Sequence, residues 1–178
     1  SRGYAAFVHP EGIYDDPKGG ALRREIYSRL RYHLQFQNEH RLFEGVDHHA
    51  KFSLNVYGPS RREPEFFHLG NLFDPLTVGA CETASSGGVL PGIKTGDNRW
   101  NTAGHPDRKV RITQRELDLF ARLYDEPGTP ALEARLPALH GQPLVEVLRC
   151  FAEAPRKLGD LEGEYYCTVM FDETNRQK

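Results

Sequence analysis

The run Asp47-His48-His49 has side chains that bind transition metals, and His40 lies a few residues upstream. Imidazole nitrogens and carboxylate oxygens are common ligands of zinc and its neighbours in the first transition row. Adjacent residues of a strand, however, point to opposite faces, and the tip of a hairpin is where solvated polar residues collect. We therefore predict no metal site in this chain and interpret the histidines as exposed residues of a hairpin.

Three acidic residues near the start of the chain, Glu11, Asp15 and Asp16, form a second cluster that could hold a divalent cation. Together with His48 or His49 they would suit a metal-dependent nuclease. Asp16 is better explained by the turn that precedes a predicted helix, where aspartate oxygens accept backbone hydrogen bonds. The nuclease is therefore the weakest of the functions that the sequence leaves open.

Two further groups of side chains have the chemistry of nucleic-acid contacts. Arginines within residues 23–31 suit a phosphate backbone, although a solvated helix face explains them equally well. Phe67, Trp100 and Tyr166 could stack on bases, but packing in a core or an interface is the simpler interpretation. The sequence contains no GxGxxG, GxxxxGK[ST], GxSxG or HExxH motif. These residues thus form no complete active site.

The elements that position these residues follow from the apolar pattern. Ala21–His33 predicts a helix because Leu22, Ile26 and Leu30 fall on one face. Around it, apolar runs and alternation predict three strands, of which the first is buried: Tyr4–His9, Leu34–Phe43 and Lys51–Tyr57. The last two strands should pair antiparallel through a short connection, and a crossover should join the first two.

Gly58-Pro59 predicts a boundary between an α/β part, residues 1–58, and a loop-rich and then helical extension, residues 59–178. Helices should follow a capping box at Thr113–Glu116 and begin again at Pro143. The other expected segments of the extension are a strand at Glu65–Leu69, an irregular stretch over Asn71–Asp107 and a last strand at Glu164–Met170. The predicted fold class is α/β.

Composition narrows the choice of function. The 178 residues include 23 Lys and Arg against 25 Asp and Glu, and this near-neutral balance argues against a dedicated nucleic-acid binder but permits a local basic face. No apolar run could span a membrane and no signal-peptide pattern begins the chain. Three unclustered cysteines favour reduced thiols in the cytoplasm. Because Met170 is the single methionine, we expect a piece of a longer polypeptide.

Several segments resemble the second half of a class I, S-adenosylmethionine-dependent N6-adenine DNA methyltransferase of restriction-modification and phage-defence systems. The strongest are Tyr4-Ala-Ala-Phe-Val-His-Pro-Glu-Gly-Ile-Tyr, Gly19-Gly-Ala-Leu-Arg-Arg-Glu-Ile-Tyr, Leu42-Phe43 and Lys51-Phe-Ser-Leu-Asn-Val-Tyr-Gly. His68-Leu-Gly-Asn-Leu-Phe-Asp-Pro and Leu119-Phe-Ala-Arg-Leu-Tyr-Asp resemble the region after the catalytic core. The similarity thus extends over most of the chain.

The resemblance implies that the three strands of residues 1–58 are the last three of a methylase sheet. It places Phe43 where some members of the family pack an aromatic ring against an adenine flipped out of the duplex, with Lys51 near a phosphate. A ring that simply caps the core of the hairpin explains Phe43 equally well. Arg23 and Arg24 are the other candidate DNA contacts. Residues from about 60 onward would begin a target-recognition or linker region, and DNA would bind through the full-length protein, with defence-system subunits as further partners.

The family's two strongest motifs are missing from this chain. These are the Gly-rich turn that binds S-adenosylmethionine and the [Asn/Asp/Ser]-Pro-Pro-aromatic motif that holds the target adenine. We therefore expect no catalytic or cofactor-binding residue here, no methyl transfer by the isolated chain, and S-adenosylmethionine as a cofactor of the parent protein alone. The alternative is a stand-alone interaction module of a defence complex.

Overall fold

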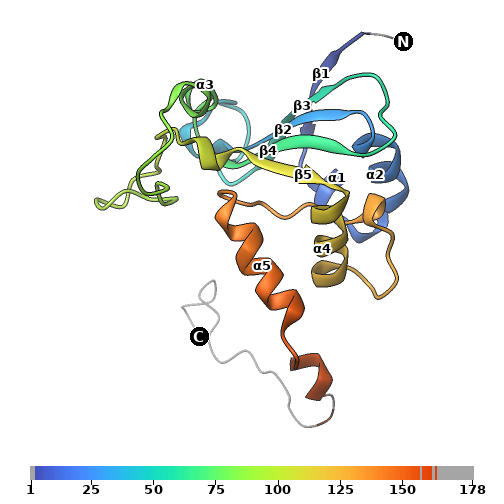
Figure 1. Cartoon of the computed structure of the whole chain (residues 1–178). Helices are drawn as coiled ribbons and strands as arrows, with labels where there is room; N and C mark the ends of the chain where they lie inside the picture. Colours follow the sequence, from blue (N-terminus) through green and yellow to red (C-terminus); the bar gives the residue numbers. More distant parts are fainter. Residues whose placement is uncertain (1–2, 157, 162, 164–178) are drawn as a thin grey trace, which may run out of the picture.

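The computed structural model describes residues 3–156, 158–161 and 163, and its centre is one sheet of five strands (Figure 1). The strands are β1 (Ala5–Pro10), β2 (Leu30–Gln37), β3 (Lys51–Tyr57), β4 (Glu65–Leu72) and β5 (Val110–Thr113). Their order across the sheet is β1-β3-β2-β4-β5. Only β2 and β4 pair in parallel, and the other neighbours are antiparallel. The predicted α/β class is confirmed.

Three strands run in the same direction, which brings their ends to one side of the sheet. β1 and β2 are both antiparallel to β3, and β4 is parallel to β2. Pro10 therefore lies beside Phe52, while Gln37 lies beside Lys51. The loops that follow β1, β2 and β4 consequently leave from the same edge, which we call the carboxyl edge.

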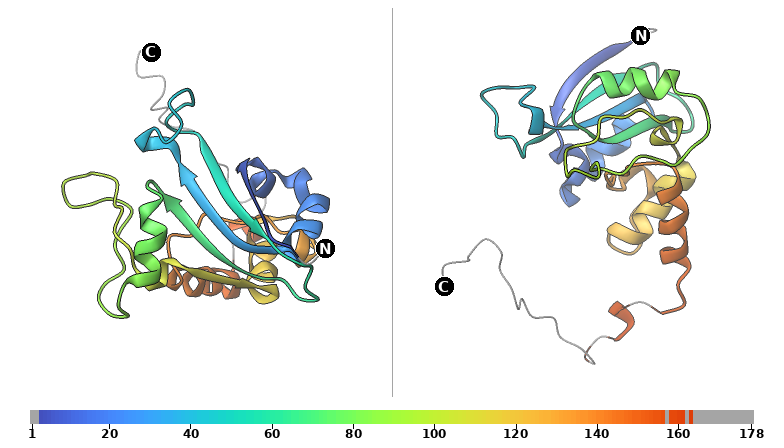
Figure 2. Two further views of the ribbon diagram at one scale, coloured as in Figure 1. Left: turned by 90° about the horizontal axis from the view of Figure 1, so that it is seen from above. Right: turned by 90° about the vertical axis from the view of Figure 1, so that its left-hand side faces the viewer.

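Helices cover the two faces of the sheet unequally (Figures 1 and 2). Four α-helices lie on one face: α1 (Gly12–Asp15), α2 (Gly20–Tyr27), α4 (Gln114–Tyr124) and α5 (Pro143–Glu153). α3 (Leu76–Thr83) alone lies on the other face, where Cys81 packs on strands β2 and β4. The short 3-10 helices are η1 (Pro17–Gly19), η2 (Asn38–His40), η3 (Pro106–Arg108), η4 (Ala131–Glu133) and η5 (Leu158–Leu161). No helix in the described ranges is long and apolar enough to cross a bilayer.

The boundary between the predicted helix and the next strand lies earlier than expected. The helix ends at Tyr27, and β2 begins at Leu30, which pairs with Tyr57 of β3. The expected apolar stripe is buried only in part, because Leu22 is 51% exposed whereas Ile26 packs against the core. The inner face of α2 is filled by Gly20, Arg23 and Tyr27. The pairing of Leu30 with β3 therefore outweighs the helical spacing of Leu30 from the preceding apolar residues.

The first strand differs from its prediction as well. An apolar run predicted a buried strand, but β1 is exposed, with Phe7 at 54% and Val8 at 55%. The reason is its position at the end of the sheet order, where it pairs with β3 alone among the described strands. β1 thus presents one open edge and apolar side chains on both faces.

The second part of the chain continues the same sheet. β4 lies directly beside β2, so the sheet runs across the predicted boundary at Pro59. The capping box at Thr113 and the helix from Pro143 are confirmed, whereas α3 replaces part of the expected irregular stretch and β5 follows that stretch without having been predicted. The strand predicted at Glu164–Met170 lies outside the described residues.

Arg23 joins α2 to the end of α1 and to η4. The side chain is 1% exposed, and its Nε donates to the Glu133 carbonyl at 2.9 Å. Its Nη1 donates to the carbonyls of Ile13 and Asp16 at 3.0 and 2.7 Å. The neighbouring Arg24 is half exposed and forms an ion pair with the Glu133 carboxylate. One arginine is therefore a buried structural donor, and the other lies at the surface.

We expect Arg23→Ala to lower the free energy of unfolding by about 3 kcal/mol, because it leaves buried carbonyls without their charged donor. Arg24→Ala is the matched control at the next position, and loss of a surface ion pair should cost about 1 kcal/mol or less. Urea unfolding of both variants measures the difference. Equal losses would show that the Arg23 bonds do not hold the fold.

Candidate nucleic-acid interface

The loop over residues 38–50 joins β2 to β3 at the carboxyl edge. In open α/β sheets, ligands bind in the crevice outside the carboxyl ends of the strands. The loop begins with η2 and ends where Lys51 opens β3. It carries Phe43, and it lies between strands that the sequence predicted to pair antiparallel, a prediction that the register of β2 and β3 confirms.

One buried side chain fixes the path of this loop. Asn38 is fully buried, and its Nδ2 lies 2.9 Å from the carbonyls of both Phe43 and Val46. It also lies 3.3 Å from the Asp47 carbonyl, while its Oδ1 accepts the Phe43 N–H at 3.0 Å. The side-chain amide of Asn38 thus supplies backbone hydrogen bonds that regular secondary structure would supply in a strand or helix. The loop is ordered before any ligand binds.

Phe43 and Lys51 lie at the same end of the β2–β3 pair. The Phe43 ring stands edge-on to Phe52 with 4.9 Å between ring centres, yet 44% of the residue is exposed. Lys51 precedes Phe52 and is exposed. Successive strand residues point to opposite faces, so Lys51 lies on the face opposite Phe52, on which Phe43 packs. An aromatic ring can stack on an unpaired base, and a cation at the same edge can approach a phosphate. This pair is the candidate interface.

The two arginines predicted as DNA contacts do not join this pair. Both lie on α2, on the helix-covered face, and both bond to residues of that face. The guanidinium of Arg23 is buried and its donors are engaged. Arg24 remains accessible but lies on a different element from Phe43. We therefore base the interface on Phe43 and Lys51.

Trp100 is engaged in packing near the same edge. Its ring stacks on Phe73 with 4.5 Å between centres, and the Lys94 Nζ lies 3.9 Å from its centroid. Phe67 is partly buried, with the Lys109 Nζ over its ring. Tyr166 lies outside the described residues. Trp100 and Phe67 thus pack against neighbouring side chains, and Phe43, which packs on Phe52, is still 44% exposed.

A line of buried polar groups crosses the helix-covered face of the sheet. His33 Nδ1 lies 2.7 Å from His68 Nδ1, and the Leu139 N–H donates to His68 Nε2 at 3.2 Å. At the other end, His33 Nε2 lies 2.9 Å from Glu11 Oε1. Both histidines are fully buried, and Glu11 is 3% exposed. The line connects the turn after β1, the strands β2 and β4, and the segment before α5.

The bonding partners determine where the protons sit. Because His68 Nε2 accepts from a backbone N–H, His68 carries its proton on Nδ1 and donates it to His33 Nδ1. His33 is then protonated on Nε2, the atom that faces the Glu11 carboxylate. This last contact is close but poorly aligned for a hydrogen bond. Burial holds the pKa of His68 well below its ordinary value, with the nearby His33 adding to the effect.

Tyr14 supports this line from the side. Its ring lies edge-on to His33 with 4.2 Å between centres, and its hydroxyl donates to Asn55 Oδ1 at 2.6 Å. Burial raises the pKa of Tyr14, so the phenol keeps its proton and remains a donor. Asn55 Nδ2 in turn donates to Ser53 Oγ at 2.9 Å. Buried polar groups on β3 thus extend the network.

The acidic residues of the nuclease alternative are not arranged as a cation site. Glu11 faces His33 in the interior, not the surface histidines of the loop. Asp16 Oδ1 accepts the Lys18 N–H at 2.8 Å and begins η1, as its predicted role in a turn requires. Burial and the nearby Glu11 raise the pKa of Asp15. The geometry therefore supports a structural role for this cluster.

Sequence reasoning missed two groups of residues. His33 and His68 lie in the middle of apolar strands, and a histidine in such a position is a signal of a buried polar partner. Their pairing, across 35 residues, is not visible in the sequence. Glu39, His48 and His49 form the second group, because the structure gathers their side chains on the surface of the loop.

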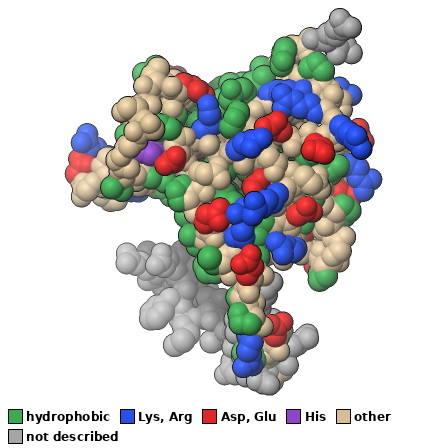
Figure 3. Space-filling model, in the orientation of Figure 1, with side chains coloured by type: hydrophobic (Ala, Val, Ile, Leu, Met, Phe, Trp, Pro, Cys, Tyr) green, Lys and Arg blue, Asp and Glu red, His purple; other side chains and the backbone are tan. Residues whose placement is uncertain are grey.

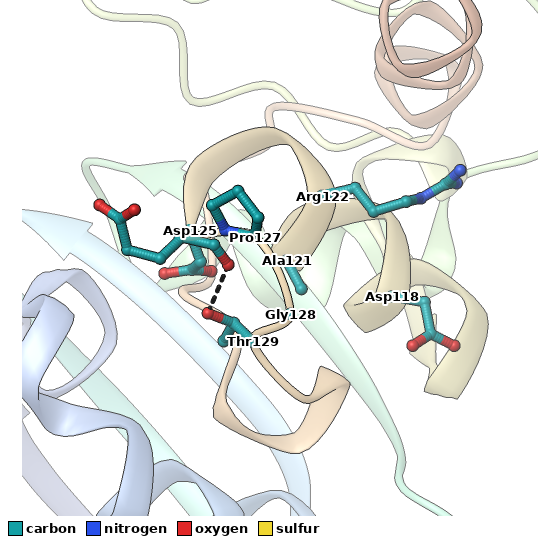
Figure 4. Close-up of a pocket in the computed structure, with 8 residues that line it drawn as sticks. Asp118, Ala121, Arg122, Asp125, Pro127, Gly128 and Thr129 are labelled. Carbon is teal, nitrogen blue, oxygen red and sulfur yellow. Dashed lines mark hydrogen bonds between the residues drawn. The ribbon is translucent and has the colours of Figure 1, made fainter.

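Hollows of the described surface lie beside the loop, where His40 and Trp100 line one, and at the end of α4. The hollow at the end of α4 contains an internal bond from the Thr129 hydroxyl to the Glu126 carbonyl (Figure 4). Its Asp125 carboxylate is bonded to Arg135 at 2.8 Å. On the face seen in Figure 3, basic and acidic side chains are interspersed, which matches surface pairs such as Arg111–Glu65. No large single-sign field is visible on that face.

Comparisons with protein-family models, with curated proteins and with solved structures gave no match. Function is therefore argued from the residues of this chain and from the resemblance of its segments.

We expect the free energy of unfolding to fall as the pH is lowered below about 6.5, because unfolded His68 takes up a proton that the folded protein excludes. One such group contributes a slope approaching about 1.4 kcal/mol per pH unit. His68→Asn should remove this slope, which urea unfolding across this pH range measures. His140, whose pKa burial also lowers, contributes equally to both proteins.

If His68→Asn retained the full slope, His68 would not be the group that excludes a proton.

Gly70 permits the close approach that the line of polar groups needs. A Cβ there would lie 2.7 Å from the Leu139 carbonyl oxygen and 2.9 Å from His68 Nε2. We expect Gly70→Ala to lower the free energy of unfolding by about 1–3 kcal/mol, because the backbone at Leu139 must move to make room for the methyl group. Gly79→Ala in α3 meets no atom within 4 Å and should be neutral or stabilise by up to about 1 kcal/mol. Thermal unfolding compares the two, and a neutral Gly70→Ala would contradict the tight packing.

Proposed function

We propose that this chain is part of a DNA adenine-N6 methyltransferase of a restriction-modification or phage-defence system. It would supply the last strands of the catalytic sheet and the start of the following region. The observation that carries the proposal is the loop 38–50, fixed by Asn38, which holds a partly exposed Phe43 at the carboxyl edge. S-adenosylmethionine would be the methyl donor of the parent protein, and the cytoplasm the compartment where it meets DNA.

The arrangement of β1, β2 and β3 supports this proposal. The segments that carry the resemblance are adjacent in one sheet, in the order β1-β3-β2. The open edge of β1 has exposed Phe7 and Val8, and a soluble domain seldom leaves an apolar edge strand uncovered. The preceding strands of a larger sheet would cover that edge.

In adenine methylation, the role of Phe43 would be to stack on the target base. The amino group of a stacked base is out of reach, so such enzymes turn the base out of the duplex, at a cost of a few kcal/mol. A ring that stacks on the extruded base offsets part of that cost. Lys51 would hold a neighbouring phosphate and thereby orient the strand.

The methyl donor would be bound by other residues of the parent. The turn after β1 is the nearest candidate in this chain, but Glu11 is turned to His33 and Asp16 to the Lys18 amide. Glu11 is buried and out of reach of a ribose, and one oxygen of Asp16 is already used in the turn. Since the chain also lacks the Gly-rich turn and the Pro-Pro-aromatic motif, this part of the protein would bind and position DNA rather than transfer the methyl group.

The second candidate is a stand-alone interaction module of a defence complex. The exposed edge and faces of β1 favour it, because a partner strand could cover them as well as a preceding strand of the same protein. The coding sequence upstream of Ser1 distinguishes the two functions. A Pro-Pro-aromatic motif with a Gly-rich turn before it supports the methylase, and a start codon near Ser1 supports the module.

In the full-length methylase, we expect Phe43→Ala to lower the rate of methyl transfer to DNA adenine by roughly 5- to 150-fold, the value of one base–aromatic stack. Phe43→Trp should retain most of the rate, because it keeps a stacking surface. Leu42→Ala is the control, since Leu42 is also an exposed apolar residue of the loop. Radiolabelled methyl transfer measures all three. Equal rates for Phe43→Ala and Leu42→Ala would remove Phe43 from the interface.

A further inference from the structure

Three side chains of the loop 38–50 converge on one point of the surface. Ligand atoms of Glu39, His48 and His49 all lie within 4.8 Å of one another. His48 Nδ1 lies 3.6 Å from Glu39 Oε2, and His49 Nδ1 lies 3.3 Å from Glu39 Oε1. Two ligands bound tetrahedrally to zinc at 2.1 Å are about 3.4 Å apart. The observed separations are those of ligands across an ion.

A turn, not a strand, presents the two adjacent histidines on one side. The Asp47 carboxylate accepts the His49 N–H at 2.7 Å, and the Asp47 carbonyl accepts the Ala50 N–H at 3.0 Å. The Asn38 side chain donates to the same Asp47 carbonyl. The imidazole centres are consequently 3.7 Å apart. Strand alternation, which led us to predict no metal site, does not apply here.

The carboxylate is already oriented by a second residue. Gln37 Nε2 donates to Glu39 Oε1 at 3.0 Å, and the Glu39 side chain is only 13% exposed. Partners of this kind fix the orientation of metal ligands. The two histidines are more exposed, at 45% and 69% of their side chains, which leaves room for a water ligand.

We propose that Glu39, His48 and His49 form a binding site for a divalent ion of the first transition row, with zinc as the physiological ion. Two imidazoles and one carboxylate favour zinc over magnesium or calcium, which prefer oxygen ligands. A water molecule completes the coordination at the solvent side. The ion connects the start of the loop to its end, with Phe43 between them. This site does not depend on the proposed function.

Zinc titration of the full, tag-free chain by calorimetry tests the site, in a background with Cys150→Ser and Cys167→Ser so that the buried Cys81 is the one thiol left. We expect one zinc ion per chain and a rise in the unfolding temperature with zinc. His48→Ala, His49→Ala and Glu39→Gln should each weaken binding by more than about 10-fold, the lower range for loss of a supporting partner. Affinity should fall at acidic pH, because zinc binds neutral imidazole.

The control is His40→Ala, since His40 is exposed in the same loop but is not one of the three ligands. It should bind zinc as the unmodified chain does. Circular dichroism verifies that each variant folds, so lost binding reports on the ligands. Absence of stoichiometric binding, or equal weakening by His40→Ala and His48→Ala, overturns the proposal. Cobalt substitution gives an independent readout, and its visible spectrum should show nitrogen and oxygen ligands around the ion.

Discussion

The line from Glu11 through His33 and His68 to the Leu139 amide is the constraint on which the sheet depends. Buried donors and acceptors without partners cost free energy, so each member requires the next at hydrogen-bond distance. The line crosses the turn after β1, the strands β2 and β4, and the segment before α5. A shift of β2 by one residue would turn His33 to the opposite face and break both of its contacts. The line thus specifies the register of the sheet.

The position of the loop at the carboxyl edge depends on that register. His33 lies at the centre of β2, and Asn38 follows directly after this strand. The position of His33 therefore also determines the position of Asn38. The Asn38 side chain then donates hydrogen bonds to the carbonyls of Phe43 and Asp47, and these bonds fix the positions of Phe43 and of the turn at Asp47. The candidate DNA contact and the candidate zinc ligands therefore share one support. A rigid support of this kind is what a site needs to act without first ordering its own loop.

Local signals in the sequence predicted the elements that local interactions form. The capping box at Thr113 and the proline at 143 each mark a helix start, and the alternation over 51–57 marks β3. Long-range pairing decides the rest. Leu30 fits a helical spacing yet pairs with Tyr57, and β5 is a strand of four residues because β4 lies beside it. The histidine pair depends on a contact across 35 residues that no sequence window contains, and the approach of Glu39 to His48 and His49 depends on a turn, to which strand alternation does not apply.

Electrostatics connects the two proposals for the loop. Within residues 38–50, three acidic residues and one arginine leave two negative charges when histidine is neutral. That charge repels a phosphate backbone at the place where Phe43 must approach a base. A bound divalent ion would cancel it and leave Lys51 as the local cation. DNA contact through this loop would then be stronger with the ion than without it, whereas a structural ion remote from DNA would change stability alone.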